Sequence, residues 1–229
     1  MTKSIISFES ADTLPAHLLG GANLGNENVS AEDMAIPQLK LAQLMSGEMK
    51  KTDAKHLKGL EIGHIFNTLT GDFFDAMYVL NLKFEAGFTI FKKRTAGGGF
   101  EGFHQNLGDA HQHLADNNLN EEEHDLVDTG IHTVAYLDAT GENINSVARI
   151  YMSGANKKVS DAWNTNIASY DCDRFGTVWE LTSVEESNRM GQGYQVFKAA
   201  NKGAAGAELY KQARSTYFAM KGMTDPTIH

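Results

Sequence analysis

Histidine and acidic residues gather in one part of the chain, where they could collect a divalent cation. Imidazole and carboxylate groups bind such ions, but no pair of them has the spacing of a closed zinc site. Acid–base catalysis would need a dry pocket, which so polar a segment does not offer. We therefore expect a solvated loop and no metal, with a metal-dependent nuclease as an alternative that would require a divalent ion. The set comprises His104, His111, His113, His124, Asp109, Asp116 and the glutamates at 121–123.

Other catalytic signatures are missing from the sequence. The Gly-rich stretch TAGGGFEG at 95–102 lacks the Lys-Ser/Thr of a phosphate loop and the spacing of a dinucleotide site. Neither a G-x-S-x-G elbow nor an H-E-x-x-H pair occurs. The only cysteine, Cys172, excludes an internal disulfide, and its neighbours Asp171 and Asp173 disfavour a thiolate nucleophile. The sequence thus predicts no catalytic residue, no cofactor and a protein that is not an enzyme.

The charge is unevenly distributed. The 229 residues carry a net charge of −9, which argues at first against a polyanionic partner. Residues 101–147, however, contain ten acidic and no basic residues, so the rest of the chain has 20 basic against 19 acidic. A fold that projects the acidic block as a loop could still keep a basic groove elsewhere.

Basic side chains alternate with aromatic ones at several places. Bases that stack on aromatic rings beside a charged groove are typical of sequence-tolerant binding to single strands. Each ring taken alone could equally belong to a core. The pattern indicates a single-stranded nucleic-acid-binding protein. The groups are Phe84, Phe88 and Phe91 with Lys92, Lys93 and Arg94; Arg149 with Tyr151; Lys157 and Lys158 with Trp163; and Arg174 with Phe175.

Three regions are expected along the chain. Residues 1–35 are rich in Gly, Asn, Ser and Glu and predict a flexible arm without a secretory signal. Residues 36–200 form the predicted binding domain, in which 101–128 is an acidic, His-rich loop with at most one short helix. Residues 201–229 form a helical tail. No segment approaches the roughly 20 apolar residues that cross a bilayer, so we expect no membrane contact.

The elements that must position the basic and aromatic groups are mostly strands. After a short helix or extended lead-in behind Pro37, a turn at 70–72 joins two β arms. The second arm changes phase near Asn81 and Gly87, which indicates a bulge or strong bend. Further elements are a hairpin (132–138 and 145–153), a helix over 154–170 that Ser160 or Asn156 could cap, two strands (175–186 and 193–200) and a helix over 206–220.

This order predicts a mainly β (α+β) fold. We expect a five- or six-stranded antiparallel OB-like barrel with an inserted helix, a polar acidic excursion and a C-terminal helix. Strands and helices do not alternate, which argues against a parallel doubly wound sheet.

Several segments resemble a family of small single-stranded DNA-binding proteins from tailed-phage replication and recombination modules. They are IPQLK at 36–40, GHIFNTLTG at 63–71, FKKRTAGGGF at 91–100 and SGANKKVSDAWN at 153–164, and the likeness spans roughly residues 36–200. The resemblance implies an OB-type barrel and a DNA-facing set of Lys92, Lys93, Arg94, Lys157, Lys158, Trp163 and Asn164. Unlike many such proteins, this chain ends in KGMTDPTIH and not in an acidic tail.

The residues and the resemblance together predict a protein of phage DNA replication or recombination in the host cytoplasm. Single-stranded DNA is the expected partner, with phage replication proteins as further partners and a homo-oligomer left open. The alternative is a virion or assembly protein, whose apolar contacts would not weaken with salt as phosphate contacts do. The predicted binding residues are Lys92, Lys93, Arg94, Arg149, Tyr151, Lys157, Lys158, Trp163 and Asn164.

Overall fold

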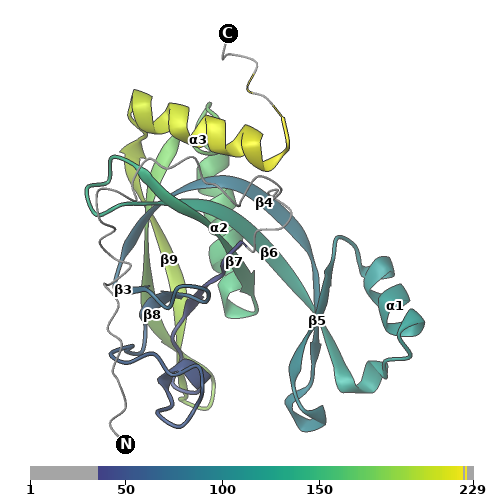
Figure 1. The fold of residues 1–229 in the computed structure, drawn as a ribbon. Coiled ribbons are helices and arrows are strands. Elements are labelled where there is room, and N and C mark those ends of the chain that lie inside the picture. Colours follow the sequence, from purple (N-terminus) through teal and green to yellow (C-terminus); the bar gives the residue numbers. More distant parts are fainter. Residues whose placement is uncertain (1–35, 224, 226–229) are drawn as a thin grey trace, which may run out of the picture. The chain divides into compact units, whose positions relative to one another are not determined.

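The computed structural model describes residues 36–223 and residue 225 (Figure 1). The chain divides into two units between Ala35 and Ile36, and every described residue belongs to the second unit. The predicted N-terminal arm, residues 1–35, lies outside the described residues. No helix in the described part is long and apolar enough to cross a membrane.

An antiparallel sheet of six strands dominates this unit, which confirms the mainly β class. Its strands follow the order β7-β6-β4-β8-β9, and β5 pairs with β4. The two longest strands, β4 and β6, pair along most of their lengths and cross the sheet as long curved ribbons (Figure 1). The strands are β4 (Met77–Lys92), β5 (Gly99–His104), β6 (His124–Leu137), β7 (Ile144–Ser153), β8 (Thr177–Ser187) and β9 (Gly193–Ala204).

The predicted closure into a barrel is absent from residues 36–223, because the edge strands β7 and β9 do not pair. Helix α2 (Ala155–Ala168) contacts both of these strands. Its buried Trp163 and Ile167 share one core cluster with Met152 of β7 and Phe197 of β9. Side chains of the helix therefore occupy the space between the two edges, and the sheet stays open.

Strand β4 leaves part of one edge unpaired. One edge pairs with β6 over residues 79–92. The other edge pairs with β8 over residues 77–80 and with β5 over residues 88–92. In the described part of the chain, no strand pairs with residues 81–87 on this second edge, and the resulting gap positions the pocket described below.

The predicted bulge in β4 is confirmed. The register with β6 shifts between Asn81 and Lys83. Asn81 pairs with Val134, whereas Phe84 pairs with His132, two residues away on β6. Since alternate residues of a strand share a face, the bulge places Asn81 and Phe84 on one face of the sheet although they are three residues apart.

Gly87 marks the place where β5 meets β4. A β-carbon at Gly87 would lie 2.3 Å from the backbone oxygen of His104 and 2.5 Å from the ring of Phe103. The two strands can therefore meet closely here only at a glycine. The register between β4 and β6 does not shift at this position, so the second predicted irregularity is a close approach and not a bulge.

A second, three-stranded sheet holds the N-terminal part of the unit. The lead-in is extended and not helical, and its strand β1 (Leu39–Leu41) pairs with β2 (Ile65–Asn67). Strand β2 pairs in turn with β3 (Phe73–Phe74) across the predicted turn at 70–72. The hairpin is thus shorter than expected, because β4 joins the main sheet.

The remaining elements largely match the sequence pattern. The hairpins β6–β7 and β8–β9 form, and α2 and α3 (Ala207–Met220) lie where helices are expected. The segment 101–128 is more than a loop, because it contains the end of β5, the start of β6 and helix α1 (Leu107–Asp116). Buried Ala110 and Leu114 of α1 pack with Ile90 of β4. Short 3-10 turns lie at η2 (Gly47–Met49), η3 (Arg94–Ala96) and η4 (Glu121–Glu123).

Candidate functional site

The predicted basic tip lies at the end of the β4–β5 hairpin. Lys92 ends β4, and exposed Arg94 opens the turn η3. Lys93 is engaged already, since its ammonium donates to the backbone oxygen of Glu122 at 2.7 Å and lies 3.8 Å from Asp125. Lys92 and Arg94 form no ion pair within residues 36–223, so they are the cations of the tip that remain available for a ligand.

Arg149 and Tyr151 lie on β7. Both are half-buried and alternate with the buried Ala148, Ile150 and Met152, so they share one face of the strand. The backbone of Arg149 bridges to the segment before β1, and its buried Nε atom has no hydrogen-bond partner in the described residues. Arg149 is therefore held within the structure, while Tyr151 lines a cleft.

The two predicted lysines of α2 differ in their surroundings. Lys157 lies 2.6 Å from Asp161 and 3.4 Å from Asp128. The hydrogen bond that Lys157 donates to Asp161 is the chief reason why these carboxylates raise the pKa of Lys157, and their negative charges offset its positive charge. Lys158 is exposed and forms no ion pair in the described part of the chain. Only Lys158 offers a free charge.

Trp163 is a core residue, which corrects its prediction as a stacking platform. Its side chain is 1% exposed. One face stacks on the ring of His132 at 4.6 Å between centroids, and an edge meets Trp179 at 6.0 Å. A nucleic-acid base cannot reach the ring without unpacking the core. The neighbouring Asn164 is also engaged, because it accepts a hydrogen bond from Arg174.

A cleft of about 420 Å³ opens between β1, β7 and the β4–β5 hairpin; we call it the aromatic cleft. The rings of Phe91 and Phe100 meet edge to face at 6.2 Å, and Phe100 is 58% exposed. Lys40 is the one charged residue among those that line the cleft, and no carboxylate lines it. The lining residues are Gln38, Leu39, Lys40, Leu41, Gln43, Phe91, Phe100, Tyr151, Ser153, Asn156 and Phe197.

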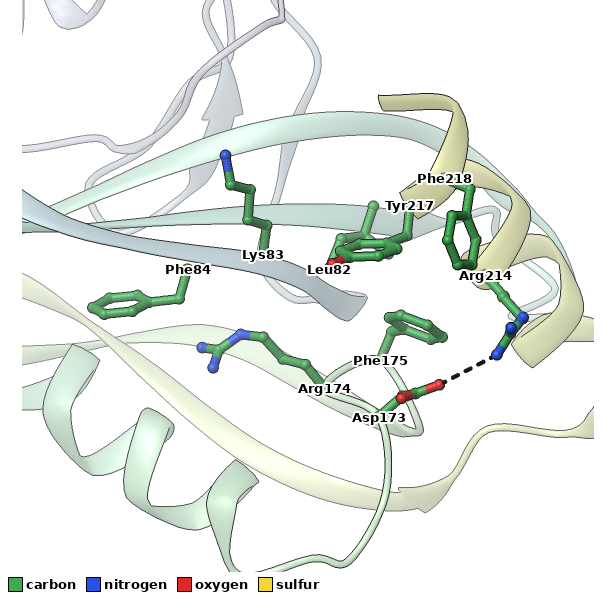
Figure 2. Close-up of a pocket in the computed structure, with 9 residues that line it drawn as sticks. All are labelled: Leu82, Lys83, Phe84, Asp173, Arg174, Phe175, Arg214, Tyr217 and Phe218. Atoms are coloured by element: carbon green, nitrogen blue, oxygen red, sulfur yellow. Dashed lines mark ion pairs between the residues drawn. The ribbon is translucent and has the colours of Figure 1, made fainter. Parts of the chain in front are cut away.

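A second hollow, of about 300 Å³, lies at the unpaired stretch of β4; we call it the Arg174 pocket (Figure 2). Three segments build it, namely β4, the loop before β8, and α3 (Figure 2). It combines three cations and four aromatic rings with one carboxylate. The lining residues are Leu82, Lys83, Phe84, Asp173, Arg174, Phe175, Arg214, Tyr217 and Phe218.

Polar side chains from β4, β6 and α2 hold the guanidinium of Arg174 in place by polar contacts. Its Nε donates to the Oδ1 atom of buried Asn81 at 2.7 Å, and its Nη2 donates to Oδ1 of Asn164. Nη2 also lies 3.4 Å from Nδ1 of His132. The ring of Phe84 covers the cation at 5.4 Å from its centroid. The orientation of the guanidinium is thus fixed by groups that carry no opposite charge.

His132 is neutral in this network. Its Nδ1 faces two donors, the amide of Asn81 at 2.9 Å and Nη2 of Arg174, so Nδ1 must accept. The proton therefore resides on Nε2, which donates to Oγ of Ser160 at 2.8 Å. Burial, and secondarily the charge of Arg174, lowers the pKa of His132 from 6.5 to about 3.

Local sequence features explain how these groups meet. Ser160 lies in the middle of α2 and faces the sheet, so it does not cap the helix as the sequence suggested. The helix approaches β6 over Gly130, where a β-carbon would lie 2.4 Å from Oγ of Ser160 and 2.9 Å from the Phe84 ring. A glycine at this position lets α2 come close enough for Ser160 to reach His132.

Sequence reasoning missed most of this pocket. The sequence places Arg174 next to Phe175 without pointing to a pocket, and Asn81 indicates only a bulge. The available signal was polar: Asn81 and His132 share their faces of β4 and β6 with the apolar residues Val79 and Val134. Buried polar residues need partners, so such interruptions predict a buried network.

The histidine-rich segment does not assemble a metal site in the described residues. No group of three or more His, Cys, Asp or Glu side chains there could hold an ion. The rings of His104 and His113 meet at a tilt with 4.8 Å between centroids, and His111 pairs with Glu121 at 3.0 Å. The segment therefore packs α1 against the hairpin.

The fold and its two hollows define a mainly β protein with an open antiparallel sheet that presents an aromatic cleft and a half-buried arginine. Residues 8–225 match the family described as Pam3 phage gp34-like protein, and the chain belongs to this family. It is accordingly a phage protein. No curated protein and no solved structure matches the chain.

Proposed function

We propose that this phage protein binds single-stranded DNA without sequence preference, with bases stacked in the aromatic cleft and phosphates held by basic groups around it. The observation that carries the proposal is the composition of the cleft. Four rings, those of Phe91, Phe100, Tyr151 and the buried Phe197, line one open hollow whose single charged residue is Lys40. Such a combination suits a base with its attached phosphate.

The exposure of Phe100 supports the proposal. Burying a phenylalanine ring stabilises a protein by about 1.5–3 kcal/mol, so a ring that is 58% exposed forgoes much of this gain. The half-buried Phe91 holds Phe100 edge to face and so fixes the orientation of its free side. An oriented, exposed ring is what a stacking site requires.

Cations without ion pairs in residues 36–223 lie along the chain close to the cleft. Lys92 and Arg94 follow Phe91 in the same hairpin, and Lys158 follows Asn156 of the cleft lining by two residues. Lys40 lies in the lining itself. Lys93 and Lys157 already contact carboxylates, so we assign them smaller contributions.

The test is fluorescence anisotropy of labelled oligo-dT at several salt concentrations. We expect Phe100→Ala to weaken binding about 5- to 150-fold, which corresponds to the loss of one stacked base. Lys40→Gln should lower the salt slope by about 0.7, the contribution of one phosphate of a single strand.

Two matched variants serve as controls. Tyr170→Ala removes another exposed ring, beyond the end of α2, and Lys51→Gln removes another exposed lysine. Both should bind as the unmodified protein does. The proposal fails if oligo-dT does not bind at low salt, or if Phe100→Ala and Tyr170→Ala have equal affinities.

In this proposal the protein acts in phage replication or recombination in the host cytoplasm, where it covers single-stranded intermediates and contacts phage replication proteins or further copies of itself. The alternative is a virion or assembly protein. Self-association that persists at high salt, together with no binding of oligo-dT, would favour that alternative.

A further inference from the structure

We propose that the Arg174 pocket binds the phosphate of a nucleotide, with the guanidinium of Arg174 as its anchor. Two sources offer this chemistry, namely a nucleotide within a bound strand and a free nucleoside monophosphate. For the strand, the inference rests on the proposed function; for the free nucleotide, it does not.

Arg174 carries a charge that no carboxylate of the described residues compensates. Arg174 is half-buried, yet within the described residues no carboxylate lies within ion-pair distance of it. Its partners Asn81, Asn164 and neutral His132 satisfy hydrogen bonds without cancelling the charge. Burial accordingly lowers the pKa of Arg174 from 12.5 to about 10. Because a buried charge is costly without a counter-charge, a bound anion would stabilise this arrangement.

The hydrogen bonds that orient Arg174 leave some of its donors free. The hydrogen bonds to Asn81 and Asn164 occupy Nε and Nη2 of Arg174. Nη1 forms no hydrogen bond with residues 36–223 or 225, and it is not among the buried unpartnered atoms. Its two N–H groups can therefore reach a ligand without any rearrangement of the network. A rigid guanidinium with free donors is well suited to a phosphate.

The remaining walls suit a nucleotide. Arg214 supplies a second cation, also paired with a carboxylate, whereas the side chain of Lys83 leaves β4 on the side opposite to Arg174 (Figure 2). Asp173 is the one acidic residue of the lining, and it is occupied by Tyr210 and by Arg214 at 3.8 Å. The rings of Phe175, Tyr217 and Phe218 offer apolar surface beside these charges (Figure 2). A phosphate alone would use only the cations, whereas a nucleotide also uses the rings.

The two hollows are linked through helix α2. Asn156 lines the aromatic cleft, and Asn164 holds Arg174. Eight residues of helix separate them by about 12 Å along the axis. This length corresponds to about four nucleotides at the 3.4 Å rise of a stacked strand, within the known range of roughly 4–16 nucleotides per binding domain. Helix α2 therefore joins the linings of the two sites.

The experiment compares Arg174→Gln with Arg189→Gln, an exposed arginine of the β8–β9 loop that forms no ion pair in the described chain. Oligo-dT is titrated by anisotropy over a range of salt, and thymidine monophosphate, thymidine and inorganic phosphate are titrated by calorimetry. We expect Arg174→Gln to weaken oligo-dT binding on the order of tenfold and to lower the salt slope by about 0.7, with Arg189→Gln unchanged. Thymidine monophosphate should bind more tightly than thymidine or phosphate, and its binding should be lost in Arg174→Gln.

The outcomes separate this inference from the proposed function. If Phe100→Ala weakens oligo-dT binding but Arg174→Gln behaves like Arg189→Gln, and the monophosphate does not bind, the pocket inference is overturned and the cleft stands. If oligo-dT does not bind but the monophosphate binds and is lost in Arg174→Gln, the pocket takes the free nucleotide and the strand proposal falls. Should Arg174→Gln not fold, Arg174→Lys keeps the charge but not the planar fork of donors, and monophosphate affinity equal to that of the unmodified protein in that variant overturns the inference.

Discussion

Replacing Trp163 by alanine distinguishes a core residue from a stacking platform. The ring is 1% exposed and packs against His132 and Trp179, so its removal leaves a large cavity. Truncating a buried Trp or Phe to Ala costs about 3–5 kcal/mol. Domains are stable by only about 5–15 kcal/mol, so this loss is a large fraction of the total. For a domain of this size each kcal/mol lowers the Tm by about 2–4 °C, which predicts a drop of roughly 6–20 °C.

Urea unfolding followed by the fluorescence of Trp179 measures this loss, and Tyr170→Ala is the control because its ring is exposed just beyond α2. Below its own melting temperature, Trp163→Ala should bind oligo-dT nearly as the unmodified protein does. Trp163→Phe should cost less than alanine, since it keeps part of the ring and removes an indole N–H that has no hydrogen-bond partner in the described residues. A destabilisation under about 1 kcal/mol, or a stable variant that has lost DNA affinity, would refute the assignment of Trp163 to the core.

Two further predictions concern the network beneath Arg174. His132 has a pKa of about 3 when folded and 6.5 when unfolded, so the unfolded state gains a proton first as the pH falls. The neutral His132 therefore stabilises the folded state fully above pH 6.5, and this contribution, on the order of 4 kcal/mol, is lost progressively toward pH 3. His132→Gln should flatten this part of a stability–pH curve measured by urea unfolding. Gly130→Ala should destabilise by about 1–3 kcal/mol, because its β-carbon would lie 2.4 Å from Oγ of Ser160. Gly206→Ala meets no atom within 4 Å and should lose only the N-cap preference for glycine at α3, about 0.5 kcal/mol, in the same assay.

Local patterns in the sequence were sufficient to predict most elements. Alternating residues predicted the β6–β7 hairpin, and helical spacing predicted α2, because both patterns arise from the residues of a single segment. The phase change at Asn81 predicted the bulge for the same reason. The turn at 70–72 was predicted from its Thr-Gly-Asp chemistry, although β3 and not β4 became its second arm.

The site depended on contacts that no local pattern contains. Asn81, His132, Ser160, Asn164 and Arg174 come from four segments and meet only because β4 bulges and α2 approaches β6 over a glycine. The spacing of Trp163 fits either a core residue or a platform for base stacking. The packing of α2 against the sheet buries its ring and makes it a core residue. The same packing kept β7 and β9 apart, so closure of the sheet was a tertiary outcome. Composition and periodicity determined which segments are strands and helices. Burial and charge compensation determined which side chains remain available to a ligand, and both depend on neighbours that are distant in the sequence.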